Sequence, residues 1–130
     1  MEDFSDRYVN LGLVSCQYTS FVPTIDVSRE QFILNTRTYS CILINTELLD
    51  QRLDERWRGT YNEDTDLSLR VLSTGDLCTV NFNSLLSGKQ TTGSMVGGNT
   101  STIYEGGTVS GYQKKFDELK NNWPDIVKFT

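Results

Sequence analysis

The feature that most constrains the fold is a helix-forming segment that lies between two strand-like runs. This helix is expected to begin after Asn62, a residue type favoured as an N-cap. Glu63 and Asp64 place negative charge in its first turn, where the helix dipole favours carboxylates. Gly75 is placed to end the helix in a left-handed conformation. The apolar side chains that repeat on one side of this segment are Leu67, Val71 and Leu72.

Three strand-like runs accompany this helix. Residues 8–15 alternate, with Val9, Leu11 and Leu13 predicted on one face, and Gly12 indicates a close approach of another part of the chain. Residues 40–45 form an apolar run long enough for a buried strand, and residues 78–86 alternate as a further strand. Alternating strands and helices predict an α/β fold.

The remaining segments are less regular. Residues 32–39 are ambiguous between strand and loop, and residues 50–58 predict one or two helical turns with a solvated charged face. Asp66 and Arg70, four residues apart, are expected to form a surface pair that contributes a few tenths of a kcal/mol. A final helix is expected over residues 111–122 with Tyr112, Phe116 and Leu119 on one face, followed by a short strand over 125–129.

Composition limits the class of protein. The 130 residues suit one domain, and no apolar run approaches the roughly 20 residues that span a membrane. The acidic N-terminus lacks the apolar core of a signal peptide, so a cytoplasmic protein is expected, with Cys16, Cys41 and Cys78 as buried reduced thiols. The net charge of −5 disfavours tight, non-specific DNA binding by this chain alone.

Carboxylates are the candidate catalytic groups, because the chain has no histidine. Glu63, Asp64 and Asp66 gather at the start of the predicted helix. They either complement the helix dipole, accept a proton from an attacking hydroxyl, or hold a divalent cation, and the pattern leaves these readings open.

A polar, glycine-rich loop over residues 87–102 is long enough to indicate a substrate-contacting segment, although a plain surface loop fits equally well. Lys89 within it could meet a phosphate, but the Walker pattern is absent. Tyr18, Phe21, Tyr39 and Trp57 could stack on a base or sugar, although such aromatics are more often core residues.

The run Asn62-Glu63-Asp64-Thr65-Asp66-Leu67-Ser68-Leu69-Arg70, together with Gly75, Lys89, Thr91 and Gly97-Gly98-Asn99-Thr100, resembles the TET/JBP-associated glycosyltransferases. The resemblance extends from about residue 8 to the end of the chain and includes residues 123–127. These are GT-A-type enzymes of bacteriophages, related to the glucosyltransferase that makes base J. The resemblance implies a partial GT-A-like, Rossmann-related α/β domain with short strands and two to three helices, in the cytoplasm of a phage-infected cell.

The resemblance also implies roles for individual residues. Asp64 would be the catalytic base, Glu63 would orient the acceptor or share the proton, and Asp66 would assist a metal site or hold the helix start. The implied substrate contacts come from Asn62, Lys89, Thr91, Gly97, Gly98 and Asn99. The implied reaction moves a sugar from a nucleotide sugar to a hydroxymethylated pyrimidine in DNA, with Mn²⁺ or Mg²⁺ as the expected divalent metal.

The chain departs from the family pattern in what surrounds the resembling region. The donor-binding half of the family lies upstream of the region that resembles residue 8, and here only seven residues precede it. We therefore expect residues 1–130 to be a single domain that corresponds to the acceptor-side half, with a donor-binding half or partner chain elsewhere. A non-catalytic binding or interaction module derived from the same fold is the alternative.

Overall fold

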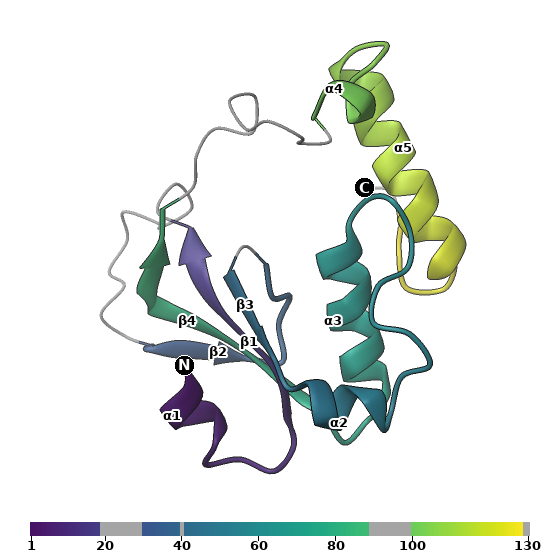
Figure 1. Ribbon diagram of the computed structural model, residues 1–130. Helices are drawn as coiled ribbons and strands as arrows, with labels where there is room; N and C mark the ends of the chain where they lie inside the picture. The colour runs from purple at the N-terminus through teal and green to yellow at the C-terminus, as the bar shows by residue number, and fades with distance from the viewer. Residues whose placement is uncertain (19–29, 40, 89–99, 129–130) are drawn as a thin grey trace. The chain divides into compact units, whose positions relative to one another are not determined.

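The computed structural model describes residues 1–18, 30–39, 41–88 and 100–128 (Figure 1). It is a mixed α/β structure, as the sequence predicts. Its elements, in chain order, are α1 (Glu2–Ser5), β1 (Leu11–Tyr18), β2 (Phe32–Leu34), β3 (Cys41–Ile44), α2 (Thr46–Asp50), α3 (Glu63–Ser73), β4 (Cys78–Ser87), α4 (Thr100–Ile103) and α5 (Thr108–Asn122). The chain divides into two compact units, one of residues 1–58 and 64–89, the other of residues 59–63 and 90–130.

The first unit is built on a four-stranded sheet with the order β2-β4-β1-β3. The two central strands, β1 and β4, run parallel, whereas β2 and β3 pair antiparallel at the two edges. The predicted strand over 40–45 is therefore present as β3, but it is a half-buried edge strand and not a buried one. Because α3 precedes β4 in the chain, its first turn lies at the end of the sheet where β1 and β4 finish (Figure 1).

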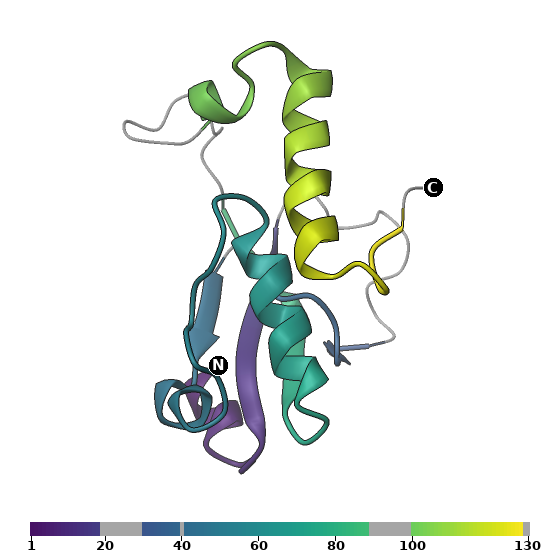
Figure 2. The ribbon, with the colours of Figure 1, turned by 90° about the vertical axis from the view of Figure 1, so that its right-hand side faces the viewer.

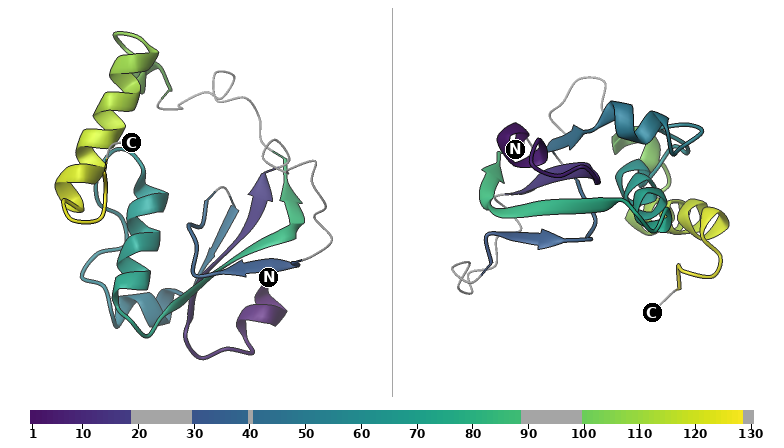
Figure 3. Two further views of the ribbon diagram at one scale, coloured as in Figure 1. Left: turned by 180° about the vertical axis from the view of Figure 1, so that it is seen from behind. Right: turned by 90° about the horizontal axis from the view of Figure 1, so that it is seen from below.

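Helices lie on both sides of this sheet, α1 on one and α2 with α3 on the other (Figure 2; Figure 3), and an apolar cluster lies on each face. On one face, Leu13 packs with Leu49 of α2 and with Leu67 and Val71 of α3. On the other face, Phe4 of α1 packs with the cluster of Leu11, Val14 and Val80. Burial of these side chains fixes α1 on one side of the sheet and α2 with α3 on the other.

The side chains of β1 change their order of alternation at Gly12. The pairing of β1 with β4 shifts register between Leu11 and Leu13, so Leu11 and Leu13 point to opposite faces. The predicted shared face of Val9, Leu11 and Leu13 is thus wrong, and Val9 itself is exposed. The predicted close approach at Gly12 is confirmed, because a Cβ there would lie 3.1 Å from side-chain atoms of both Leu49 and Val71.

Helix α3 matches its prediction at both ends. It begins at Glu63, and Gly75 follows it with φ of 81°, the left-handed conformation that ends helices. Asn62 also has a positive φ, 55°, and its side-chain amide donates to the carbonyl of Lys115 at 2.9 Å. The Asn62 side chain therefore also bonds to the C-terminal part of the chain.

The helical turns predicted over residues 50–58 are absent from residues 51–58. The helical turn lies earlier, in α2, and its N-cap is Asn45, whose side chain accepts from the amide of Leu48. The side chains of the stretch take part in ion pairs: Arg56 binds Asp50 at 2.5 Å and Arg52 binds Asp76 at 2.8 Å. These pairs hold residues 51–58 in an irregular path along the helices of the first unit.

The second unit consists mainly of α5, which confirms the predicted final helix but begins three residues earlier. Tyr112 is exposed, in contrast to the predicted apolar face, and its ring meets that of Tyr104 edge-on at 6.1 Å. After Trp123 the chain makes a turn, in which the amides of Ile126 and Val127 both donate to the carbonyl of Trp123. The strand expected over 125–129 is therefore absent from residues 125–128, and Phe129 lies outside the described residues.

Within the described ranges, the helices are too short or too polar for any of them to cross a bilayer.

Candidate active site

Residues 35–39, which follow β2 in the chain, form hydrogen bonds with both β4 and α3. This segment carries two of the side chains of the candidate site. Asn35 turns the chain out of β2 with φ of 51°, and its amide donates to the carbonyl of Thr79 at 2.8 Å. The Thr79 hydroxyl donates in return to the carbonyl of Thr36 at 2.5 Å. Further along, the amide of Thr38 donates to the hydroxyl of Ser68 on α3 at 3.0 Å. The 35–39 segment is thus tied to β4 at one end and to α3 at the other.

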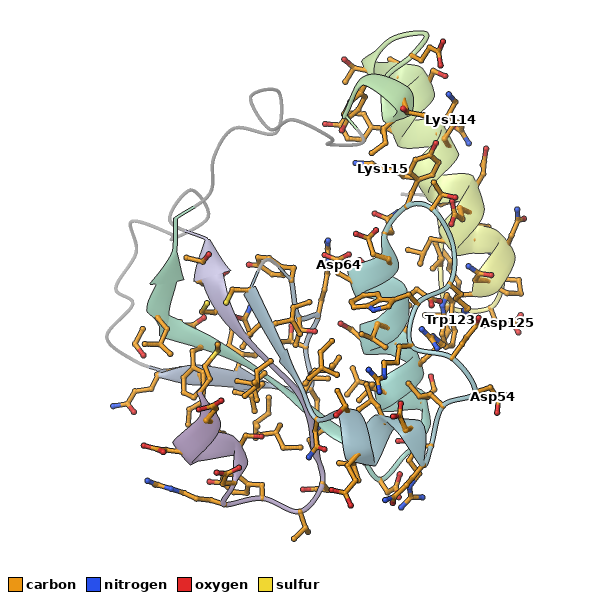
Figure 4. The ribbon with its side chains drawn as sticks, viewed as in Figure 1. Asp54, Asp64, Lys114, Lys115, Trp123 and Asp125 are labelled. Atoms are coloured by element: carbon orange, nitrogen blue, oxygen red, sulfur yellow. The ribbon has the colours of Figure 1, made fainter. Side chains whose placement is uncertain are left out.

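Asp64, the predicted base, is held by this segment at the first turn of α3 (Figure 4). Arg37 donates from its guanidinium to Oδ2 of Asp64 at 2.8 Å. The other oxygen, Oδ1, accepts from the amide and the hydroxyl of Thr65, at 2.7 and 3.2 Å. The side chain of Asp64 keeps 22% of its surface exposed and that of Arg37 keeps 52%. The carboxylate is therefore oriented by neighbours on both oxygens and still accessible to a second molecule.

Polar side chains gather beside Arg37 at the carboxyl ends of the parallel strands. The guanidinium of Arg37 lies 5.5 Å from the centre of the Tyr39 ring, and the hydroxyl of Tyr39 donates to Oε1 of Gln17 on β1. Gln17 in turn donates to Oδ1 of Asn83 on β4 at 3.5 Å. We call Asp64, Arg37, Tyr39, Gln17 and Asn83 the Asp64 cluster. In open α/β sheets, ligands bind outside the carboxyl ends of the strands, which is where this cluster lies.

Two buried polar atoms lie on the sheet below this cluster. Ser15 of β1 and Asn81 of β4 are paired in register, and both side chains are almost fully buried. Neither the Oγ of Ser15 nor the Oδ1 of Asn81 has a hydrogen-bond partner among the described residues. A buried polar atom without a partner costs about 1–3 kcal/mol, so such a pair is uncommon in a part of the protein that only needs to be stable.

Asp66 points away from Asp64 and belongs to a separate ionic network. Its side chain is 2% exposed, and its two oxygens accept from Arg58 at 2.9–3.1 Å and from Arg70 at 2.9 Å. Arg70 also donates to the backbone carbonyls of Glu55 and Arg56. The predicted exposed pair of Asp66 and Arg70 is therefore wrong, because Asp66 is buried and the side chain of Arg70 is only 9% exposed. The hydrogen bonds to Asp66 outweigh desolvation and raise the pKa of Arg58 above its ordinary value.

The predicted carboxylates do not form one cation site among the described residues. Glu63 is exposed at the start of α3, Asp64 is engaged by one guanidinium, and Asp66 is engaged by two. In the described ranges, no three side chains of cysteine, aspartate or glutamate come together as metal ligands do. Asp66 in this arrangement does not fit a metal ligand, because two guanidinium groups already neutralise its charge.

The other predicted contact residues are Lys89, Thr91, Gly97, Gly98 and Asn99, which lie outside the described residues. Conversely, the structure adds Arg37, Gln17 and Asn83, which were not predicted as site residues, and it places beside them Tyr39, one of the aromatics considered for stacking. Gln17 and Asn83 could have been found from the rule that ligands bind at the carboxyl ends of parallel strands. No local signal marks Arg37, because it reaches Asp64 only through the path of the 35–39 segment.

Comparison with known protein families gives a match over most of the chain. The model of a family described as TET-Associated Glycosyltransferase matches residues 1–98. The matched range includes β1 to β4 and the whole Asp64 cluster, and it ends before α4 and α5. No curated protein and no solved structure matches the chain.

Proposed function

Because this chain belongs to the TET-associated glycosyltransferase family, we propose that it serves a transferase that moves a sugar from a nucleotide sugar to a hydroxymethylated pyrimidine in DNA. The family makes the function glycosyltransferase-related. The observation that carries the more specific proposal is the Asp64 carboxylate, which is oriented by Arg37 and Thr65 and remains partly exposed. An accessible, oriented carboxylate is what a general base requires.

In the proposed reaction, Asp64 accepts the proton of the acceptor hydroxyl while the hydroxyl oxygen attacks the anomeric carbon of the sugar. The bond from that carbon to the donor phosphate breaks, and its electron pair leaves with the nucleoside diphosphate. A direct displacement of this kind inverts the configuration at the anomeric carbon. Arg37 is half-exposed beside Asp64, and its planar guanidinium suits the phosphate oxygens on which negative charge develops.

The remaining predicted residues enter the proposal in supporting roles. Glu63, exposed beside Asp64 in sequence, orients the acceptor, and Asn62 supports the start of α3. Lys89, Thr91 and residues 97–99 contact donor phosphates or the DNA backbone. Asp66 holds the helix against the 55–58 stretch through Arg58 and Arg70.

We further propose that the chain is a GT-A-like, acceptor-side part of a phage enzyme and that a donor-binding half or partner chain completes it. A divalent metal, where the complete enzyme uses one, would bind ligands outside the described residues and would neutralise the donor phosphates.

The test is a transfer assay with labelled nucleotide sugar and duplex DNA that contains 5-hydroxymethylcytosine or 5-hydroxymethyluracil. Asp64→Asn removes the base and keeps the shape, and Asp54→Asn changes an exposed carboxylate elsewhere in the first unit as a control (Figure 4). In the completed enzyme, we expect transfer by the wild type and by Asp54→Asn, and loss of transfer by Asp64→Asn. Near-normal transfer by Asp64→Asn would refute the base assignment.

A thermal-shift titration with UDP-sugars, with and without Mn²⁺ or Mg²⁺, tests the separate proposal of a missing donor half. No stabilisation is expected for the chain alone, and the transfer assay is then run with the completing partner. Metal-dependent stabilisation of the chain alone would show that residues 1–130 hold the donor, and it would contradict the missing half.

A further inference from the structure

Cys16 and Cys41 lie directly opposite each other on two neighbouring strands. Cys16 belongs to β1 and Cys41 to the antiparallel edge strand β3, and their Cα atoms are paired in register. The amide of Asn45 donates to the carbonyl of Gly12, and counting by twos along the ladder makes Cys16 and Cys41 a hydrogen-bonded pair as well. Opposed residues of this type have Cα atoms about 5.5 Å apart, within the range of roughly 4.4–6.8 Å that a disulfide spans. Their Cβ atoms lie at the upper end of the roughly 4.5–5.5 Å found for opposed residues, so bond formation has to draw the two strands about 1 Å closer together at this position.

The two thiols differ in their access to solvent. Cys41 is exposed, whereas Cys16 is 7% exposed, and its Sγ lies 4.0 Å from the carbonyl oxygen of Cys41. Burial, followed by the hydrogen bond to the Cys41 side chain, raises the pKa of Cys16. An oxidant from solvent therefore meets Cys41 first, and Cys16 is the nearest thiol that can resolve the product.

We propose that Cys16 and Cys41 are a redox modification site, which forms a reversible cross-strand disulfide when the protein meets a peroxide. The Cys41 thiolate attacks one oxygen of the peroxide, the O–O bond breaks, and Cys41 becomes a sulfenic acid as a molecule of water or alcohol leaves. The sulfur of Cys16 then attacks the sulfur of that sulfenic acid, and water leaves as the S–S bond forms. The two thiols together lose two electrons and two protons, which reduce the peroxide.

The bond would fasten the edge of the sheet next to the Asp64 cluster. Cys16 immediately precedes Gln17, and Cys41 follows Tyr39 by two residues. The hydrogen bond from Tyr39 to Gln17 therefore bridges the same two parts of the chain as the proposed disulfide. Oxidation would lock this contact, whatever reaction the Asp64 cluster performs.

The test treats the purified full chain with hydrogen peroxide at low concentration and counts free thiols after the excess is removed. Three free cysteines are expected before treatment and one afterwards, with an intact mass lower by two hydrogen atoms and restored by dithiothreitol. Peptide mapping should find Cys16 joined to Cys41. Closing this loop should raise Tm by about 10 °C relative to the reduced protein.

Three variants separate this site from general oxidation. Cys78→Ser, which changes the half-buried third cysteine at the other end of the β1–β4 ladder, should form the bond as the wild type does. Cys16→Ser and Cys41→Ser should each lose the bond and the rise in Tm. A bond that involves Cys78, a bond between two chains, or oxidation of Cys41 to sulfinic acid with Cys16 still reduced would overturn the proposal.

Discussion

Arg37 donates a 2.8 Å hydrogen bond to Asp64, although 27 residues separate them in the sequence. The contact depends on the 35–39 segment, which reaches α3 after it leaves β2. The carboxylate at the start of α3 is thus oriented by a side chain from a distant part of the chain as well as by its own helix. This relationship supports the first prediction.

Arg37→Ala should lower the rate of transfer by the completed enzyme by about tenfold. The variant loses one charge-assisted hydrogen bond, and a free energy of about 1.4 kcal/mol in the barrier corresponds to a factor of about ten in rate. The free energy of unfolding should change by less than about 1 kcal/mol, because both partners are partly exposed. Arg52→Ala is the matched control, since Arg52 forms an exposed pair of the same length with Asp76. Equal transfer rates for the two variants would remove Arg37 from the site.

Asp66→Asn should destabilise the fold by about 3–5 kcal/mol, because it leaves the guanidinium groups of Arg58 and Arg70 without their buried carboxylate. Urea denaturation followed by circular dichroism measures this change. Asp76→Asn breaks an exposed pair and should cost less than about 1 kcal/mol. If both variants lost a similar free energy of unfolding, burial of the Asp66 network would contribute little to the stability of the fold.

Gly12→Ala should destabilise the fold by about 1–3 kcal/mol, because the new methyl group would press on Leu49 and Val71 at 3.1 Å. Gly88→Ala is the control, since a Cβ at Gly88 meets nothing within 4 Å. Thermal unfolding of the two variants separates crowding from the general effect of replacing glycine. A fully stable Gly12→Ala protein would show that α2 and α3 can move away from β1 without cost.

Ser15→Ala should leave the protein at least as stable as the wild type, because it removes a buried hydroxyl that has no partner among the described residues. Thr79→Val, which deletes a buried hydroxyl that does have a partner, should cost about 1–3 kcal/mol. Urea midpoints decide between these outcomes. A marked loss of stability for Ser15→Ala would indicate that a water molecule bonds this hydroxyl in solution.

The elements of the fold that sequence could predict are those governed by local chemistry. Gly75 ends α3 because a left-handed conformation suits glycine, and β4 follows from the alternation of its side chains. The faces of β1 could not be predicted, because the register shift at Gly12 depends on how β1 pairs with β4. The mixed charges of the stretch before α3, with its spaced Leu53 and Trp57, predict a helical turn. Arg56 and Arg70 instead hold this stretch in an irregular path through contacts with other segments.

In the candidate site, too, the features set by local sequence could be predicted and those set by tertiary contacts could not. The sequence singles out Asp64 by its place at a helix start, and the structure confirms that place. It could not distinguish Asp64 from Asp66, although one is partly exposed and the other is enclosed by Arg58 and Arg70. That difference arises from helical geometry combined with tertiary packing, since residues two apart on a helix point to different sides.

The segment 59–63 depends on residues that follow it by more than 50 positions. Glu118 accepts from the backbone amides of Thr60 and Tyr61, and the carbonyl of Lys115 accepts from Asn62. A chain cut after residue 98, where the family match ends, would keep every strand of the sheet and lose both of these acceptors. Helix α5 therefore also supports the loop that leads into Asp64, and a chain shortened to the matched range would lose this support for the peptide next to the proposed base.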